Sequence, residues 1–514
     1  MTQKLFSYQY QGTDHSSYTS IAGLPLFMEM AKVSGLSDSI EQHLQLNSQG
    51  WLDRQIIESV MQLNFSGGDC VEDIDRLEAD EGLKSLLLNL EHKGMSRKER
   101  RASQTRFRKG KDRSLPSASA IRRYLEKFHH EEEEEKRLVH TAFVPAPNKA
   151  LKALTSVNQS LINFLQKNQP SQIATLDQDA TLAETHKRSA KYCYKNYQAY
   201  HPFNTYWHEQ GLLLHSEFRD GNVPAGFEQK RLLSEALDCL PASVEKVYLR
   251  SDTAAYQRNL LSYCAEGQNE RFGVIEFAIG VPATPHFKDA VLSVKEEDWQ
   301  PIYKKDEKGR LYQTNQDWAE VCFVPTWIGR SKKNPEYRYI GIRERFCRQL
   351  YLPGLEPEAV QEELPFQTLV MKKGEYKIFG VVTNRDLAGS DLIGWYRQRC
   401  GDSEKVHSME KTGLSGGQFP SNKFGANAAW WHMMVLSFNI IALMKKLVLP
   451  EELIKKQMKG LRFHLIHIAG CVVRHARQLI IKVSSNPKII DLIQFIRQKI
   501  EALATPPPSR VRCR

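Results

Sequence analysis

Carboxylate side chains occur at two positions in the chain where strand-forming runs would place them together. Asp177 and Asp179 lie inside the apolar run IATLDQDATL, and their spacing of two puts both on one face of the expected strand. Acidic residues are depleted from strand interiors, so a pair of them indicates a metal site or, as the alternative, a solvent-facing edge strand. Asp252 follows the short apolar run KVYLR. Catalytic groups collect at such strand ends in open α/β sheets, although an ordinary helix N-cap is the alternative for Asp252.

A third polar group lies in residues 394–411, which read GWYRQRCGDSEKVHSMEK. If the part from Ser403 is helical, Glu404, His407 and Lys411 share one face because they are spaced i, i+3 and i+7. A carboxylate, an imidazole and an amine in one stripe suit a metal and phosphate site. The alternative is the polar face of an amphipathic helix.

The three carboxylates Asp179, Asp252 and Glu404 offer hard oxygen ligands, which Mg²⁺ or Mn²⁺ prefers. Two such ions ~4 Å apart can activate a water or a 3′-hydroxyl and stabilise the leaving oxygen of a phosphodiester. The nine cysteines include no CxxC pair, so neither a zinc site nor a disulfide framework is expected.

The elements that must position these residues alternate between strands and helices from about residue 171, which predicts an α/β core. Residues 281–375 interrupt this core and are expected to form a largely β insertion. Its tryptophans include Trp299 and Trp327, either of which is a candidate to stack on a flipped base; a core tryptophan is the alternative. Residues 1 to about 128 have the apolar spacing of helices.

A basic segment precedes the α/β core. The chain carries a net charge of +11, and residues 96–113 contain nine lysines and arginines. A capped helix bearing Arg122 and Arg123 follows, so we expect both arginines to contact DNA; a solvated charged face is the alternative. The acidic run HHEEEEEK at residues 129–136 is expected to be an exposed helix or linker.

Membrane insertion is not expected. The longest apolar stretch, residues 428–449, is interrupted by polar and charged side chains, and a spanning helix needs about 20 consecutive apolar residues. The first residues contain no apolar segment typical of a secretory signal. These patterns predict a cytoplasmic, nucleoid-associated protein without a membrane partner.

Four segments, LDQDATLAETHK, EFRDGNVPAG, YLRSD and TNRDLAGSDLIGWYRQRC…E, resemble the DDE transposases of bacterial insertion sequences. The resemblance is to the group-1 branch, related to transposases with a Tyr-Arg-Glu-Lys signature on the last catalytic helix. Upstream, LNFSGGDCVEDIDRLEAD resembles the N-terminal domain of that group, and FGANAAWWHMMVLSFNIIALMKKLVLP continues the match downstream. Together these segments cover roughly residues 23–480.

The resemblance implies a ribonuclease-H-like α/β core with a mostly β insertion, preceded by a helical DNA-binding region. The implied boundaries are 1–136 for the DNA-binding region, 137–280 and 376–450 for the two parts of the core, 281–375 for the insertion and 451–514 for a basic C-terminal region. The implied activity is metal-dependent DNA cleavage and strand transfer by a homodimer on terminal inverted repeats. A catalytically inactive DNA-binding descendant is the alternative.

The resemblance also assigns roles to residues. Asp179, Asp252 and Glu404 match the catalytic, metal-binding acids, with two Mg²⁺ (or Mn²⁺) ions as cofactors. Tyr396, Arg399 and Lys411 match the signature residues expected to hold DNA-end phosphates. Asp179 is preferred to Asp177 because it directly precedes Ala-Thr, as the first acid of the family precedes a small residue and Thr; Asp177 and His407 are then supporting residues.

One departure from the family pattern concerns spacing. Four residues separate Arg399 from Glu404, where three are usual, and Gly401 is among them. Either the helix starts later or the segment before Glu404 bulges. The six-residue interval between Glu404 and Lys411 is kept.

Overall fold

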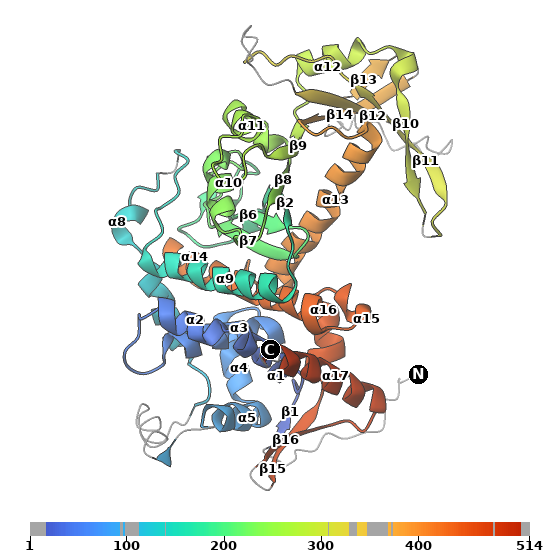
Figure 1. The fold of residues 1–514 in the computed structure, drawn as a ribbon. Helices are drawn as coiled ribbons and strands as arrows, with labels where there is room; N and C mark the ends of the chain where they lie inside the picture. The colour runs from blue at the N-terminus through green and yellow to red at the C-terminus, as the bar shows by residue number, and fades with distance from the viewer. Residues whose placement is uncertain are drawn as a thin grey trace, which may run out of the picture.

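In a computed structural model, the chain folds into a ten-stranded mixed sheet and a set of helices (Figure 1). The structure describes residues 17–92, 96–97, 113–138, 140–306, 308–327, 337–346, 368–371, 374–475 and 478–504. Most of the basic segment 96–113 therefore lies outside the described residues.

Five strands make up the centre of the sheet. They are β2 (Ile173–Ala180), β6 (Phe203–Trp207), β7 (Leu212–Glu217), β8 (Lys246–Ser251) and β9 (Glu276–Val281). The order is β9-β8-β2-β6-β7; β2, β8 and β9 are mutually parallel, whereas β6 and β7 run antiparallel to their neighbours. Helices α10 (Gln229–Asp238) and α11 (Arg258–Ala265) connect β7, β8 and β9. The α/β alternation predicted from about residue 171 is therefore present.

The strands after β9 continue the same sheet. The described part of residues 281–375 contains helix α12 (Pro285–Leu292) and strands β10 (Gln300–Lys305), β11 (Leu311–Glu320), β12 (Arg338–Arg345) and β13 (Thr368–Met371). Strand β14 (Gly374–Thr383) joins them to β9, in the order β10-β11-β12-β14-β9. The insertion strands thus extend the core sheet at the β9 edge, with β13 pairing β14 off this path.

One long helix crosses the sheet. Helix α13 (Gly389–Ser408) runs without a break through Gly401 and continues into a π-helical turn, Met409–Gly413. The helix begins next to β11, where a Cβ on Gly389 would lie 2.1 Å from the Trp318 ring. Only glycine fits there, because any larger residue would collide with the indole.

The helix α14 (Phe424–Leu443) is the centre of the helical half. It packs against α9 (Lys149–Asn168), α3 (Asp53–Ser66) and β7, and nearly all of its residues are buried. The helical region Phe424–Val448 is long and apolar enough to cross a membrane by length and composition, but 78% of its most apolar window is buried inside the protein. A helix that is apolar on all sides is typical of a protein core, and this one has neighbours on its sides.

The remaining helices and strands surround α14 and the sheet. They are β1 (Tyr18–Thr19), α1 (Leu24–Val33), α2 (Leu36–His43), α4 (Ile74–Glu78), α5 (Glu81–Glu91), α7 (Ala118–Leu125), α8 (Glu131–Glu134), β3 (Ala183–Glu184), β4 (Lys191–Tyr192), β5 (Gln198–Tyr200), α15 (Glu451–Ile454), α16 (Met458–Leu461), β15 (Gly470–His475), β16 (Gln478–Val483) and α17 (Pro487–Ala504).

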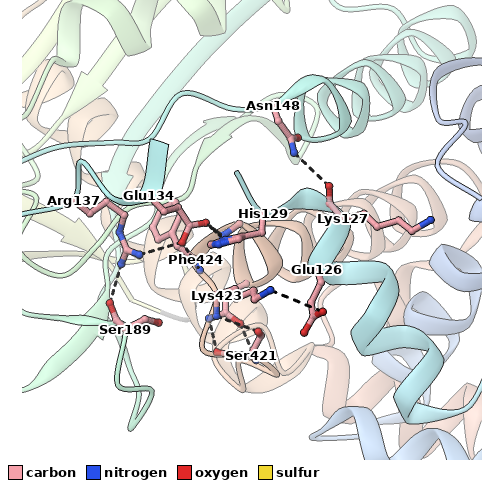
Figure 2. A network of polar contacts seen from close by, with 12 residues as sticks. Glu126, Lys127, His129, Glu134, Arg137, Asn148, Ser189, Ser421, Lys423 and Phe424 are labelled. Carbon is pink, nitrogen blue, oxygen red and sulfur yellow. Dashed lines mark hydrogen bonds and ion pairs between the residues drawn. The ribbon is translucent and has the colours of Figure 1, made fainter. Parts of the chain in front are cut away.

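The acidic run before the core is not simply exposed. Glu134 accepts hydrogen bonds from the backbone N–H groups of Phe424 (3.1 Å) and Gly425 (2.7 Å), at the start of α14 (Figure 2). It also pairs with His129 and Arg137, and only 10% of its side chain is exposed. The expectation of a solvated acidic run was wrong for Glu134, because a helix N-terminus attracts a carboxylate.

Candidate active site

Two of the predicted acids stand side by side at the edge of the central sheet. In the parallel pairing of β2 with β8, Gln178 lies opposite Ser251. The next residues along each strand are Asp179 and Asp252, so their backbones are neighbours at about the strand spacing of 4.8 Å. Both acids belong to the strand ends where ligands bind in open α/β sheets.

An arginine from α13 faces this acid pair. Nη2 of Arg399 lies 3.1 Å from Oδ2 of Asp179 and 3.4 Å from the backbone carbonyl of Gln178. Asp252 makes a local contact instead, accepting a 3.0 Å hydrogen bond from the backbone N–H of Ala254. The cap alternative for Asp252 is thus realised, since it caps a short 3₁₀ turn, and its place beside Asp179 is realised as well.

The electrostatics of the pair indicate too little positive charge. Desolvation raises the pKa of Asp179 above its usual range, although Arg399 acts in the opposite direction. Desolvation also raises the pKa of Asp252, and the neighbouring Asp179 adds to this while Arg399 opposes it. One arginine therefore does not fully compensate two partly buried carboxylates, and a bound cation would favour their ionised forms.

The signature residues Tyr396 and Lys411 lie along the same helix. The Tyr396 hydroxyl donates to the backbone carbonyl of Ser251 (3.2 Å), next to the acid pair, and burial raises the pKa of Tyr396 to about 12. Nζ of Lys411 donates to the backbone carbonyl of Leu182 (3.4 Å), just beyond β2. Together with Arg399, they provide hydrogen-bond donors on one side of the acids.

Histidines near the pair are neutral at physiological pH. Burial, followed by Lys411 and Arg399, lowers the pKa of His407 to about 4. Desolvation also lowers the pKa of His201, a buried residue at the end of β5 that sequence reasoning missed; Asp179 and Asp252 are close enough to act against this shift. Nδ1 of His201 lies 2.8 Å from the carbonyl of Val223, which requires N–H at Nδ1 and leaves a lone pair on Nε2.

Asp177 does not belong to the open acid pair. Both of its oxygens accept hydrogen bonds from Arg250, at 2.6 and 2.7 Å, and its side chain is almost fully buried. Asp177, His208 and Asp402 do offer ligand atoms within 4.8 Å of one another. However, Nδ1 of His208 already contacts Asp402 at 2.8 Å, and the Arg250 guanidinium would repel a cation. These contacts support a structural role for this group.

Glu404 is not brought to the pair in this structure. It is exposed on α13, and within the described residues its side chain makes no hydrogen bond or ion pair. Ser403 instead lies close enough to Asp179 to act toward a lower pKa of that carboxyl. The extra residue between Arg399 and Glu404 explains this. In an unbroken helix, Ser403, four residues after Arg399, shares the face of Arg399, and Glu404 is rotated by about 100° from Ser403.

Glu410 is the acid that sequence reasoning missed. It is fully buried, and its Oε1 accepts a 2.6 Å hydrogen bond from Asn204, which lies directly opposite Asp179 in the pairing of β2 with β6. Its Oε2 is buried without a partner among the described residues. Desolvation raises the pKa of Glu410 well above its usual range, and Asp179 contributes in the same direction. Its position six residues after Glu404, in the π-helical turn, is the only signal in the sequence.

The residues present fit a divalent cation. Asp179 and Asp252 supply hard oxygens, their pKa values are raised, and an unpartnered carboxylate oxygen of Glu410 lies nearby.

The other predicted DNA contacts lie on α7, in the N-terminal half. Arg122 and Arg123 are both exposed, while Ile121, Tyr124 and Leu125 of the same helix are buried. Arg122 pairs with Glu72, and within the part of the chain that the structure describes, the Arg123 side chain bonds only to the backbone of its own helix, at Ser119. The exposed face expected of this helix is therefore present.

The two tryptophans of the insertion have different surroundings. Trp299 is buried under the guanidinium of Arg343, 4.4 Å from the ring centre, so the core alternative holds for it. Trp327 is partly exposed and packs edge-on against Tyr256, which follows Asp252 by four residues.

The fold and site define a class of protein in which paired acids at the end of parallel strands face a cationic helix. Comparison of the sequence with known families identifies which: the model of the "transposase DDE domain group 1" family matches residues 9–505, and the chain belongs to this family. No curated protein matches the chain. Among solved structures, a piggyBac transposase in a synaptic complex with hairpin DNA is similar at 10% identity, covering 82% of this chain and 72% of that one; its TM-score of 0.39 is too low to support an argument.

Proposed function

We propose that the protein is an active transposase that binds the terminal inverted repeats of an insertion sequence, cuts DNA there and transfers the freed strand. The observation that carries the proposal is the acid pair Asp179–Asp252 under Arg399, in a chain of the DDE transposase family. In this reading the core is ribonuclease-H-like. The strand order β9-β8-β2-β6-β7, with an antiparallel hairpin on one side of β2 and parallel strands on the other, supports that assignment.

The proposed cofactor is a pair of Mg²⁺ or Mn²⁺ ions held by Asp179, Asp252 and Glu404. When bound, such ions activate the attacking oxygen and stabilise the leaving oxygen of a phosphodiester. Glu404 requires a rotation of its part of α13 toward Asp179. The helix already continues into a wide turn at Met409–Gly413, and a further wide turn between Arg399 and Glu404 would accommodate the extra residue and provide that rotation.

The residues around the acids have roles in holding DNA. Arg399 extends from α13 toward the acids and is placed to neutralise a phosphate at the cut. Lys411, in the turn that continues this helix, adds a second cation. Tyr396, whose raised pKa keeps its hydroxyl protonated, donates a hydrogen bond near Asp252. His407, neutral at pH 7, serves as a hydrogen-bonding partner rather than as a cation.

The proposed partners are double-stranded DNA at the element's ends and at the target, and a second copy of the chain when the ends are synapsed. The exposed arginines Arg122 and Arg123 are the proposed contacts of the N-terminal half. We place the protein in the bacterial cytoplasm, associated with the nucleoid, and the burial of α14 supports its role as a core helix rather than a membrane span.

The experiment that tests this function is cutting of a labelled duplex carrying the ends of the element in which the gene lies. Wild-type protein with Mg²⁺ should cut at the ends, and Asp252→Asn should bind the same duplex without cutting. Binding without cutting by both proteins would instead favour the alternative, an inactive DNA-binding descendant.

A further inference from the structure

The outer half of the β10–β11 hairpin is a two-stranded ribbon that leaves the sheet. Strand β11 pairs with β12 only from Gln316 to Glu320, whereas β10 and β11 pair with each other as far as Lys305 and Leu311. Within the described residues, the part of the hairpin nearest its turn therefore has no third strand beside it. This part projects from the sheet edge (Figure 1). An isolated ribbon of this kind is marginally stable in water, so a partner would stabilise it.

The ribbon exposes aromatic and basic side chains together. Tyr303 is 56% exposed, Leu311 68% and Tyr312 49%. Tyr312 lies opposite Lys304, and Tyr303 precedes Lys304, so the two tyrosines lie on opposite faces of the ribbon. Residues 304–310 hold four lysines and arginines against two acids.

The tip of the ribbon is internally bonded. The carboxylate of Asp306 accepts the backbone N–H groups of Lys308 (2.9 Å) and Arg310 (2.8 Å) as well as Nε of Arg310 (2.9 Å). These bonds lower the pKa of Asp306 and use its charge within the turn. Lys308 is left exposed at a tip whose shape is set by the chain itself.

The root of the ribbon is fixed to the catalytic helix. Trp318 of β11 packs against Gly389, the first residue of α13, too closely for any side chain there. Arg343 pairs with Asp317 on β11 (3.0 Å) and with Glu296 (2.7 Å). The direction of the ribbon is thus set relative to α13, which carries Arg399.

We propose that this ribbon binds a DNA duplex, with its lysines on the phosphates and one of its two tyrosine-bearing faces against the groove. The inference rests on the proposed function and adds a DNA-contacting surface to it. A two-stranded β ribbon fits the major groove, which is about 12 Å wide. Charge selects the occupant: an exposed aromatic surface bordered by Lys304, Lys305 and Lys308 complements a polyanion better than it complements a second copy of this basic chain.

The test compares two charge-reversed variants of the full chain. One carries Lys304→Glu, Lys305→Glu and Lys308→Glu on the ribbon. The control carries Lys149→Glu, Lys152→Glu and Lys167→Glu on α9, which are also exposed and change the net charge equally. Affinity is measured across a salt series for a duplex that carries the element's end and for a random duplex of equal length. The apparent mass of each protein without DNA is measured as well, to detect self-association.

The ribbon variant should bind both duplexes at least ~10-fold more weakly. The decrease of log affinity with log salt should become less steep by about 2–3, which corresponds to three lost phosphate contacts. The control should stay within about threefold of wild type in affinity for both duplexes. A second variant, Tyr303→Ala with Tyr312→Ala, should weaken binding while keeping the slope. Ribbon variants that bind like the control would overturn the inference, and so would unchanged DNA binding with a loss of self-association. Wild-type protein that binds neither duplex would contradict the proposed function itself.

Discussion

Arg250 holds Asp177 through two hydrogen bonds, 2.6 Å from Nε and 2.7 Å from Nη2, while its Nη1 donates to the backbone carbonyl of Trp395 at 2.7 Å. One side chain thus joins β2, β8 and α13. Because the pair lies two residues before Asp179 and Asp252 on the same two strands, it fixes the register that sets the acids side by side.

The first prediction concerns this buried pair. Asp177→Asn leaves Arg250 buried without its counter-charge and should lower the free energy of unfolding by about 3–5 kcal/mol. Urea unfolding measures it. The double variant Asp177→Leu with Arg250→Met, which removes both charges, should be closer to wild type than Asp177→Asn is. Equal stability of Asp177→Asn and wild type would show that the pair does not hold the strands.

The second prediction concerns the acid pair. Asp179→Asn and Asp252→Asn should each reduce end cutting by ~10³-fold or more, because each removes a ligand of the proposed ions. The pKa values of both acids are raised, so their charged forms are unfavourable in the metal-free fold, and neither variant should lower the melting temperature at pH 7. Mn²⁺ binding followed by electron paramagnetic resonance gives a readout independent of cutting. Retained cutting and Mn²⁺ binding would exclude these acids.

The third prediction distinguishes Glu404 from Glu410. Glu404→Gln should reduce cutting by ~10²-fold or more, and adding Ser403→Glu should restore part of it, since position 403 already faces Asp179. Mn²⁺ affinity should likewise fall in Glu404→Gln and be partly restored when Ser403→Glu is added. The converse result, normal cutting by Glu404→Gln and none by Glu410→Gln, would assign the third carboxylate to Glu410.

The fourth prediction follows from the raised pKa of Glu410. A carboxyl whose pKa is higher in the folded than in the unfolded state contributes stability that is present below the unfolded pKa, about 4.3. This contribution is lost as the pH rises through the folded value. In metal-free protein, Glu410→Gln should therefore gain stability relative to wild type as the pH is raised from 4 to 8. A stability difference that is constant across this range would contradict the burial argument.

The fifth prediction uses His407, whose pKa is lowered to about 4. A histidine with a depressed folded pKa contributes stability above its unfolded pKa of about 6.5, and the contribution is lost as the pH falls through the folded value. Its loss amounts to at most ~3 kcal/mol between pH 6.5 and 4. His407→Gln should flatten this part of the pH-stability curve, measured by thermal unfolding. His201 shifts in the same direction, so some acid sensitivity should remain.

Sequence patterns located the strands and both aspartates because these depend on local spacing. The strand run IATLDQDATL contains all of β2, and KVYLR covers β8 except for its last residue. Local spacing alone did not distinguish the roles of Asp177 and Asp179, and only the resemblance to the family favoured Asp179. The difference depends on Arg250, which lies on a strand 73 residues away and binds Asp177.

Long-range packing also decided the acids of α13. The helix is unbroken through Gly401, so one additional residue turns Glu404 away from Asp179. Glu410 becomes a neighbour of the site only because β6 presents Asn204 to it, a contact across 206 positions of the chain. Local periodicity contains no information on such contacts.

The packing of α14 against α3 has a consequence for how the protein is made. Residues 53–66 pack against α1, α2 and α4, but their contact with α14 forms only after residues 424–443 have been translated. The contact of Arg399 with Asp179 likewise requires α13. A nascent chain that already displays Arg122 and Arg123 has no assembled acid site. The proposed cutting activity therefore depends on residues that are translated well after the proposed DNA contacts Arg122 and Arg123.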